Sequence, residues 1–229
     1  MEAIILAGGK AERLGDAAAG KPKALVEIVR RPLIHFQVAR LQQAGVTRVI
    51  VSCADGQGTA FEGLSSLGVE LVVAEEPEPL GRGGGLRFAA AFRQDGGPVF
   101  ALNGDELSDL DLAAMLAQHE TAGAAATVAV APLVSGFGVV DVDDSEWITG
   151  FREAPRLPFW VSCGVYVLGR ETIERLPERG DHERSTFPQL AREGRLRAFK
   201  HEGVWLTVNT PKELRVARGF VEANPEWPS

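Results

Sequence analysis

Short apolar segments alternate with segments of helical spacing through the first half of the chain, and this alternation limits the folds available to it. The expected strands lie at residues 3–9, 46–53, 69–76, 98–105 and 124–133. The expected helices lie between them, at residues 32–45, 84–97 and 110–123. Fully apolar runs of this length are typical of strands buried on both faces. The order of elements predicts an α/β fold of the Rossmann-like, doubly wound type, with a mostly parallel, mixed sheet.

The pattern changes after residue 134. Residues 137–155 alternate short strands with turns, which predicts an inserted β-hairpin. No internal repeat or linker interrupts the sequence, so a single domain is expected over residues 1–229.

Two helix starts carry capping signals. Ser108 and Asp111 have the spacing of a capping box, which predicts that the third helix begins there. Thr210, Pro211 and Glu213 fit the cap, first-turn and capping-box positions of the last helix.

Composition excludes several classes of function. A net charge of −7 and a pI near 5.2 argue against general nucleic-acid binding, which requires a basic face. The longest apolar segment, residues 124–134, is too short to span a membrane, and the N-terminus lacks the features of a signal peptide. Two cysteines are too few for a disulfide framework. A cytoplasmic protein with neither a membrane nor a nucleic-acid partner is expected.

Cations gather around the first glycine turn of this acidic chain. Gly8 and Gly9 end the first strand, and Lys10, Arg13 and Lys23 follow. Glycines let backbone N–H groups approach a phosphate, and the cations then meet the remaining phosphate oxygens. The spacing matches neither a Walker A box nor a dinucleotide fingerprint, and a plain turn with solvated lysines is the alternative.

A second polar segment is expected beside this turn. Residues 103–105 form the carboxyl end of the expected strand at 98–105, and ligands of doubly wound sheets bind at the carboxyl ends of strands. The two segments are therefore expected to share one site.

The complete pattern resembles a known family. The stretch "LAGGKAERLGDAAAGKPKALVEIVRRPLI" is similar to the signature of nucleotide-sugar pyrophosphorylases, the sugar-1-phosphate nucleotidylyltransferases. The resemblance continues in order through "EEPEPLGRGGGLRFA", "FALNGDEL", "FGVV", "GFREAP", "CGVYVL" and "GVWLTVNTPKEL", and so covers nearly the whole chain. It is greatest to heptose or mannose 1-phosphate guanylyltransferases and to N-acetylmuramate 1-phosphate uridylyltransferase.

The resemblance implies Mg²⁺-dependent transfer of a nucleotidyl group from an NTP, with GTP slightly favoured, to a sugar 1-phosphate. The products would be an NDP-sugar and pyrophosphate. Residues 1–134 would form mainly the nucleotide-binding half, and residues 135–229 mainly the sugar-binding half with the C-terminal helix. No covalent nucleophile is required, and the four histidines are expected to be surface or packing residues.

The resemblance also implies roles for individual residues. Arg13 would hold the departing end of the triphosphate, Lys23 would bridge the α-phosphate and the sugar phosphate, and Asp105 would bind Mg²⁺; these three are the expected catalytic residues. The expected nucleotide-binding residues are Leu6, Ala7, Gly8, Gly9, Lys10, Arg13, Lys23, Gly81, Gly83, Gly84, Asn103 and Gly104. An exposed loop position is preferred for Glu76, although its carboxylate would suit a guanine edge. Arg82, at a usual threonine position, is expected either to alter base or phosphate contacts or to face solvent.

Gly138, Glu153 and Ser162 match the sugar-binding positions of the family. This chain has Ala154 where a lysine usually binds the sugar phosphate; Arg152 or Arg156 could replace that lysine, although their side chains would point differently.

The last motif departs from the family in its metal ligand. Thr207 stands where many members have the second metal-binding aspartate. The segment "VNTPKEL" resembles that of other nucleotidyltransferases, including N-acetylglucosamine-1-phosphate uridylyltransferase, in which an asparagine completes the metal site, and this resemblance implies Asn209 as the second Mg²⁺ ligand. A plain asparagine before a capped helix, or Thr207 as the ligand, is the alternative. Glu106 and Asp109 are expected to be ordinary acidic residues of a helix start.

Two other functions stay open at this point. The chain also resembles molybdenum-cofactor guanylyltransferases in "LAGGKAERLG" and "VNTPKEL". Ala154 and Thr207 would suit a catalytically weak regulatory protein that binds nucleotide sugars. The sequence leaves the base, the sugar and a homodimeric state undecided.

Overall fold

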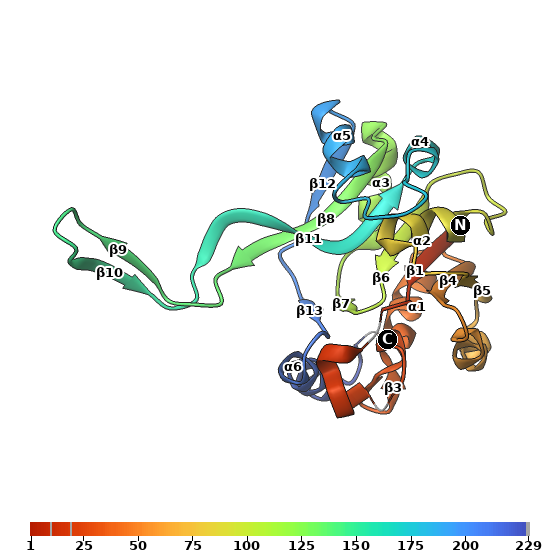
Figure 1. Ribbon diagram of the computed structural model, residues 1–229, viewed down its shortest axis with the longest axis horizontal. Coiled ribbons are helices and arrows are strands. Elements are labelled where there is room, and N and C mark those ends of the chain that lie inside the picture. The colour runs from red at the N-terminus through yellow and green to blue at the C-terminus, as the bar shows by residue number, and fades with distance from the viewer. Residues whose placement is uncertain (10, 19, 228–229) are drawn as a thin grey trace.

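A computed structural model describes residues 1–9, 11–18 and 20–227 (Figure 1). Its centre is a seven-stranded sheet with the order β12-β8-β11-β6-β1-β4-β5. These strands are β1 (Glu2–Leu6), β4 (Arg48–Ala54), β5 (Glu70–Glu76), β6 (Val99–Asn103), β8 (Ala126–Val134), β11 (Arg156–Leu168) and β12 (Leu196–Lys200). Only β11 runs antiparallel to its neighbours in this sheet, β6 and β8. The predicted fold class is confirmed.

Three short strand pairs and nine helices complete the described part of the chain. The pairs are β2 (Glu27–Ile28) with β3 (Arg31–Pro32), β7 (Glu106–Ser108) with β13 (Trp205–Thr207), and β9 (Val139–Val142) with β10 (Ile148–Arg152). The α-helices are α1 (Leu33–Gln43), α2 (Gly81–Ala90), α3 (Leu112–Ala122), α4 (Arg170–Glu174), α5 (Thr186–Arg192) and α6 (Pro211–Ala223). The 3-10 helices are η1 (Glu12–Ala18), η2 (Lys23–Leu25) and η3 (Gly58–Leu67). None of these helices is long and apolar enough to cross a membrane.

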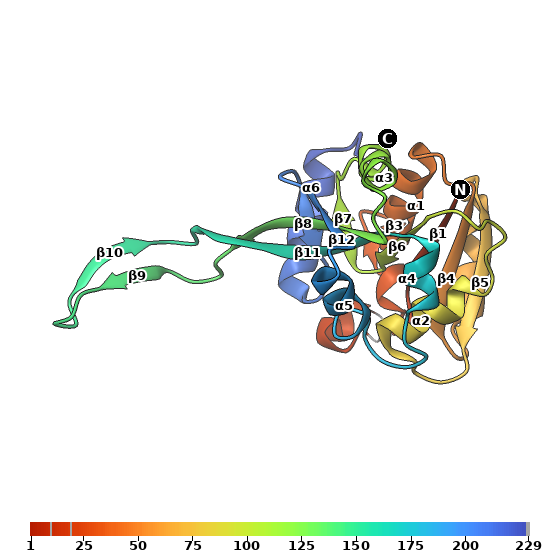
Figure 2. The same cartoon turned by 90° about the horizontal axis from the view of Figure 1, so that it is seen from above.

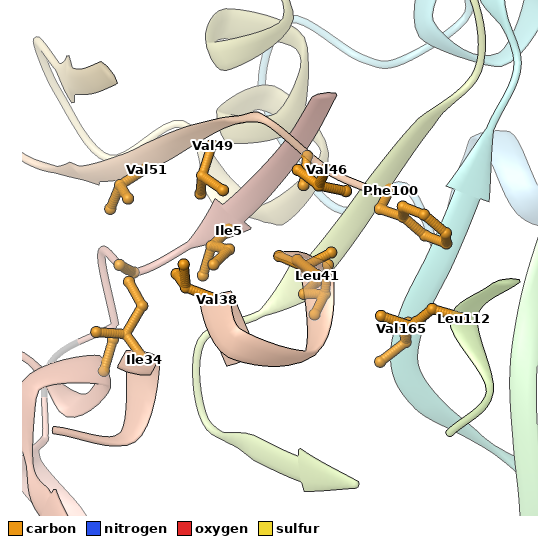
Figure 3. Packing of buried hydrophobic residues seen from close by; sticks show 14 of the residues in the cluster. Ile5, Ile34, Val38, Leu41, Val46, Val49, Val51, Phe100, Leu112 and Val165 are labelled. Carbon is orange, nitrogen blue, oxygen red and sulfur yellow. The ribbon is translucent and has the colours of Figure 1, made fainter. Parts of the chain in front are cut away.

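Helices cover both faces of the sheet. Successive side chains of β1 point to opposite faces, so Ile5 joins a core with α1, η3 and α3, whereas Ile4 joins a core with α2 and α5. Figure 3 shows the first of these cores, in which Ile5 lies beside Val38 of α1. Burial on both faces explains why the strands read as continuous apolar runs.

A third core joins the two ends of the chain. Leu14 of η1, Leu33 of α1 and Leu214 of α6 belong to one buried cluster, which also contains Leu107 and Val208. Burial of these apolar side chains holds the N-terminal loop against the C-terminal helix. This core therefore positions residues that are distant in the sequence.

The second helix differs from its expected range of 84–97, because it begins at Gly81 and ends at Ala90. The buried carboxylate of Glu2 accepts hydrogen bonds from the N–H groups of Gln94 and Asp95, at 2.9 and 3.0 Å. Because the Glu2 carboxylate accepts hydrogen bonds from these two N–H groups, they do not need helical partners, and α2 can end before them.

One of the two capping predictions is wrong. Asp111 is itself the N-cap of α3 and accepts from Ala114 N–H at 2.9 Å, while Ser108 ends β7. The capping box of α6 is confirmed, since Thr210 accepts from the Glu213 N–H and the Glu213 carboxylate accepts from Thr210 N–H.

The predicted hairpin is confirmed as β9 and β10. It continues from the ends of β8 and β11, and the two views show it extending away from the body of the molecule (Figures 1 and 2). Residues 134–160 are called the arm below.

Candidate active site

Four side chains singled out from the sequence meet at one end of the sheet. The Lys23 ammonium lies 3.0 Å from Asp105 Oδ2 and donates to Asn209 Oδ1 at 2.7 Å. Arg13 Nη2 donates to the same Asn209 oxygen at 3.0 Å. Arg13 and Asn209 are 196 positions apart in the sequence, so only the tertiary fold brings them together.

The β7–β13 ladder explains how Asp105 and Asn209 become neighbours. Glu106 pairs with Thr207 in this antiparallel ladder, and Val208 N–H donates to the Asp105 carbonyl at 2.9 Å. Asn209 follows, and its own N–H donates to the Glu213 carboxylate at 2.7 Å. The start of α6 thus fixes the Asn209 backbone beside Asp105.

A cavity of about 790 Å³ lies next to this cluster, at the carboxyl ends of β1, β4, β5 and β6. Its volume is in the range of small-molecule sites. Nine of the predicted residues line it: Leu6, Ala7, Gly8, Gly9, Lys23, Gly81, Asn103, Gly104 and Asp105. It is also lined by residues that the sequence did not single out as ligands, namely Asp55 and Pro77–Pro79. Lys10, another predicted residue, lies outside the described part of the chain.

Position 104, beside the cavity, requires a glycine because two backbone segments come close together there. The Gly104 N–H donates to the Leu6 carbonyl at 2.9 Å, and a Cβ at Gly104 would lie 2.6 Å from that same oxygen. The end of β1 and the turn after β6 are therefore packed backbone against backbone.

Two glycines of the segment 81–85, at the start of α2, have a structural role. Gly83 and Gly84 both donate to the Gly180 carbonyl, at 2.8 and 3.3 Å, and a Cβ on either would clash with residues 177–182. These two amides are already engaged by the Gly180 carbonyl, so a nucleotide contact at Gly83 or Gly84, which stays a prediction, would not use their N–H groups. Gly81 has φ +76° and lines the cavity, so its expected role stays a prediction.

A buried histidine lies behind this glycine segment. The His182 ring is fully buried and packs edge-on against Tyr166 and Phe187, at centroid distances of 5.1 and 4.7 Å. Neither ring nitrogen has a hydrogen-bond partner within the described residues. Burial lowers the pKa of His182 to about 4, against the raising effect of Glu183 and Asp181.

Acid should therefore destabilise the fold through His182. The unfolded chain binds a proton near pH 6.5 and the folded chain only near pH 4, so stability falls as the pH drops through that interval, by about 3 kcal/mol. His182→Leu should flatten this dependence, as measured by urea unfolding at several pH values. Parallel profiles for the two proteins would contradict the assignment.

Gln37 of α1 is a site residue that the sequence analysis missed. Its Nε2 donates to the carbonyls of Asn103 and Glu106, at 2.7 and 3.0 Å, so it holds both ends of the turn that carries Asp105. A signal in the sequence could have identified it. Gln37 is a polar residue at a helix position where the spacing of the neighbouring apolar residues predicts burial, and buried polar groups form hydrogen bonds.

Glu106 and Asp109 are not ordinary residues of a helix start, and that expectation is wrong. Glu106 lies in β7 and is buried, and its Oε2 accepts from the Trp205 indole of β13. Burial raises the pKa of Glu106 to about 8, and the neighbouring Asp105 charge adds to this, while the Trp205 hydrogen bond opposes it. Asp109 accepts from Val204 N–H at 2.7 Å. Both acids therefore secure the strand that leads to Asn209.

The preferred exposed position for Glu76 is also wrong. Glu76 is buried at the end of β5 and lines the cavity. Its two carboxylate oxygens accept from the Ser52 hydroxyl and the Leu80 N–H, at 2.8 and 3.1 Å. Arg82 forms ion pairs with Asp181 and Glu183, yet its side chain is 44% exposed and it lines the cavity, so both expected roles stay predictions.

The predicted sugar-binding residues are not part of the lining of this cavity. Gly138 and Glu153 are adjacent at the base of the β9–β10 hairpin, and Ser162 accepts from Gly164 N–H at the register shift within β11. None of the three lines the cavity. The two candidate substitutes for the missing lysine are already paired, Arg152 with Asp141 and Arg156 with Glu202.

The donors at the cluster suit a hard cation. Within the described residues, no group of three histidine, cysteine, aspartate or glutamate side chains could enclose a metal. Asp105 and Asn209 nevertheless direct two oxygens at one cation, the Lys23 ammonium. Mg²⁺ is commonly held by one or two carboxylates together with substrate phosphates, so two protein oxygens are a fitting donor set.

The sheet, the glycine turn after β1 and this cluster define a Rossmann-like α/β protein whose candidate ligand site lies at the carboxyl ends of its parallel strands. The chain belongs to the nucleotidyl transferase family, whose model matches residues 2–224. The family resemblance found in the sequence is thereby confirmed.

Similar proteins of known name are nucleotidyltransferases as well. The chain is 30% identical over 230 residues to the "Mannose-1-phosphate guanylyltransferase catalytic subunit beta" of Dictyostelium discoideum, covering 96% of this chain and 64% of that protein. It is 31% identical to the "Mannose-1-phosphate guanyltransferase" of Saccharomyces cerevisiae, over 93% of this chain and 63% of the relative. The chain therefore spans less than two thirds of the length of these two relatives.

Solved structures share the fold. A putative glucose-1-phosphate thymidylyltransferase from Bacillus anthracis superposes with a TM-score of 0.77 at 19% identity, covering 96% of this chain and 95% of the other. HddC from Yersinia pseudotuberculosis, in complex with GMP-PN, has a TM-score of 0.74 at 20% identity, covering 96% of this chain and 98% of the other.

Proposed function

We propose that this protein transfers a nucleotidyl group from an NTP, with GTP preferred, to a sugar 1-phosphate. The observation that carries the proposal is the convergence of Lys23 on Asp105 and Asn209 beside the glycine-lined cavity. In the reaction, a phosphate oxygen of the sugar 1-phosphate forms a bond to the α-phosphorus, and the bond from that phosphorus to pyrophosphate breaks. Both substrates are anions, so positioning and charge neutralisation are the main tasks of the protein.

Lys23 and Arg13 supply the positive charge for this task. Lys23 is mostly buried and compact, which suits a point contact to the α-phosphate and the incoming phosphate. Arg13 is more exposed and presents a planar fork, which suits the departing pyrophosphate. Both side chains meet at Asn209, so their charges act on one small volume.

Asp105 and Asn209 would hold Mg²⁺ in this site. When bound, the cation would neutralise phosphate charge and help to orient the triphosphate. Both residues lie on well-supported backbone: Gln37 holds the Asp105 turn, and the α6 capping box holds Asn209.

Asn209→Ala should raise the Mg²⁺ concentration needed for half-maximal activity by about 10-fold, because one of two oxygen ligands is lost. The measurement is a Mg²⁺ titration of turnover at saturating substrates. Thr207→Ala is the matched control, since Thr207 lies in the neighbouring ladder position opposite Glu106, and its titration should not shift. An unchanged Mg²⁺ titration for Asn209→Ala would remove this ligand from the site.

Two observations support a guanine base. Relatives at about 30% identity carry the name mannose-1-phosphate guanylyltransferase. Glu76 lines the cavity, and each of its carboxylate oxygens, which already accepts one hydrogen bond from Ser52 or Leu80, has a second lone pair that can accept from an N–H group on the guanine edge. The sugar remains a choice within the family, with mannose 1-phosphate as the first candidate.

The test is pyrophosphate release from each of the four common NTPs, paired with a panel of hexose and heptose 1-phosphates. The assay is run with Mg²⁺ and again with EDTA. We expect turnover to be greatest with GTP and to disappear with EDTA. No turnover with any pair, together with tight binding of a finished nucleotide sugar, would instead establish a binding protein.

A further inference from the structure

One wall of the cavity is a connecting segment. Residues 77–82 run from the end of β5 into the start of α2, and five of them line the cavity: Pro77, Glu78, Pro79, Gly81 and Arg82. Residues 77–80, which lie in the described part of the chain, belong to no helix or strand. The position of such a segment depends on its contacts with other parts of the protein. Residues 77–82 are called the cavity wall below.

A loop from the second half of the chain contacts the backbone of this wall. The loop, residues 177–183, lies between α4 and α5. Gly180 N–H donates to the Leu80 carbonyl at 2.7 Å, and the Gly180 carbonyl accepts from Gly83 N–H at 2.8 Å. A Cβ at Gly81 would lie 2.8 Å from the same Gly180 oxygen. The loop and the wall are therefore packed backbone against backbone.

Arg82 of the wall is joined to the same loop by two carboxylates. Its Nε donates to Asp181 Oδ2 at 3.1 Å, and its Nη2 lies 2.7 Å from Glu183 Oε2. Each carboxylate is itself held in place, because Glu183 Oε1 accepts from the buried Tyr166 hydroxyl and Asp181 Oδ1 accepts from the Glu183 N–H, both at 2.9 Å. Fixed acceptors of this kind orient the planar guanidinium.

The wall lies at the opposite end of the cavity from the Lys23 cluster. It continues from Glu76 at the end of β5, whereas Asp105 follows β6. The sheet order β6-β1-β4-β5 separates these two strands by three interstrand spacings, about 14 Å. A triphosphate bound at the Lys23 cluster would therefore direct its base toward the wall.

The charge balance around Arg82 distinguishes two possible roles. A guanidinium that lines a phosphate-binding cavity could bind phosphate itself, with Asp181 and Glu183 as competitors. Two carboxylates against one guanidinium, however, leave the group with a net negative charge, which does not attract a triphosphate. Among the described residues, neither acid is part of the cavity lining, so both act on the cavity only through Arg82.

We propose that Arg82 is a positioning residue, which holds the cavity wall, through Asp181 and Glu183, in the conformation that receives the base of the nucleotide. The inference rests on the proposed function, because it takes the occupant of the cavity to be a nucleoside triphosphate. It adds that the loop at residues 177–183 supports nucleotide binding from outside the cavity.

The test measures the binding of two probes by isothermal titration calorimetry, with Mg²⁺ present. The probes are GTP and inorganic tripolyphosphate, which carries the phosphates without the base. Arg82→Ala should weaken GTP binding by about 10-fold, because the charged hydrogen bonds that hold the wall are lost. Binding of tripolyphosphate should stay within about twofold, since its site is the Lys23 cluster.

Removal of the two carboxylates separates the two roles, because the expected changes have opposite signs. Asp181→Asn combined with Glu183→Gln keeps both shapes and removes both charges. For a positioning role, this double variant should bind GTP about 10-fold more weakly, and Arg82→Ala added to it should cause little further loss. Tighter binding of GTP and tripolyphosphate would overturn the proposal, since the acids would then have been competing with phosphate for Arg82.

Kinetics and a matched control complete the comparison. Arg82→Ala should raise the KM for GTP and leave kcat within about twofold, whereas Arg82→Lys, which keeps the charge without the fork, should recover part of the loss. Arg170→Ala breaks an exposed ion pair with Glu174 on α4 and should bind GTP as the unchanged protein does. Circular dichroism and urea unfolding establish that each variant is folded.

Failure of this inference is distinct from failure of the proposed function. An unchanged protein that binds GTP but releases no pyrophosphate would refute the transfer reaction, while the binding comparison would still decide the role of Arg82. Folded variants with unchanged GTP affinity, or with equal losses for the two probes, would overturn the positioning role. An unchanged protein that binds no nucleotide would overturn both.

Discussion

Asp105→Ala is expected to lower kcat by at least about 100- to 1,000-fold, the range found when one group that stabilises a transition state is removed. Asp105 supplies the only carboxylate that contacts Lys23 within the described cluster, and it is the proposed principal Mg²⁺ ligand. Its loss would weaken cation binding and leave the Lys23 ammonium with Asn209 alone. The measurement is pyrophosphate release at saturating GTP, sugar 1-phosphate and Mg²⁺.

Two further variants make this result specific. Asp105→Asn keeps the shape and removes the charge, so it should lose activity to a similar extent if charge is what matters. Asp144→Ala, in the exposed turn of the arm, removes an aspartate remote from the cluster and should leave kcat unchanged. Full activity of folded Asp105→Ala would refute the role of this residue in catalysis.

Lys23→Ala is expected to produce the second large loss, at least about 100-fold in kcat, because Lys23 is the proposed bridge between the two reacting phosphates. Its ammonium lies between Asp105 and Asn209, with only 14% of the side chain exposed. Lys23→Arg should not restore the rate, since a planar guanidinium does not fit a site built for a compact ammonium. Steady-state kinetics that separate kcat from KM would measure both effects.

The matched control lies two residues earlier. Lys21 is half exposed and pairs with Glu27 at 3.0 Å, away from the cluster. Lys21→Ala should leave kcat within about twofold, as expected for a surface ion pair. Equal losses for Lys21→Ala and Lys23→Ala would mean that general positive charge, rather than the position of Lys23, supports the reaction.

The strand and glycine patterns were sufficient to predict the sheet and the end of it at which the cavity lies. Both depend on short-range rules: a run buried on two faces is apolar throughout, and parallel strands end at a common edge. The α6 capping box was also predictable, because Thr210, Pro211 and Glu213 act within one helical turn.

Burial of polar residues was less predictable. Glu76 and Glu106 look like surface acids in the sequence, yet both are buried and hydrogen-bonded. Their environment is built by Ser52 and Trp205, which are 24 and 99 positions away. A local sequence pattern cannot predict hydrogen bonds to residues so far away in the chain.

By itself, the sequence determined which chemistry-bearing residues the protein has and the family to which it belongs. Tertiary structure alone decided that Asn209 lies beside Asp105, and that the arm stands apart from the cavity. The physical reason is the range of the forces involved. Propensity, capping and turn preferences act over a few residues, whereas the β7–β13 register and the core beneath α6 arise from burial of side chains from opposite ends of the chain.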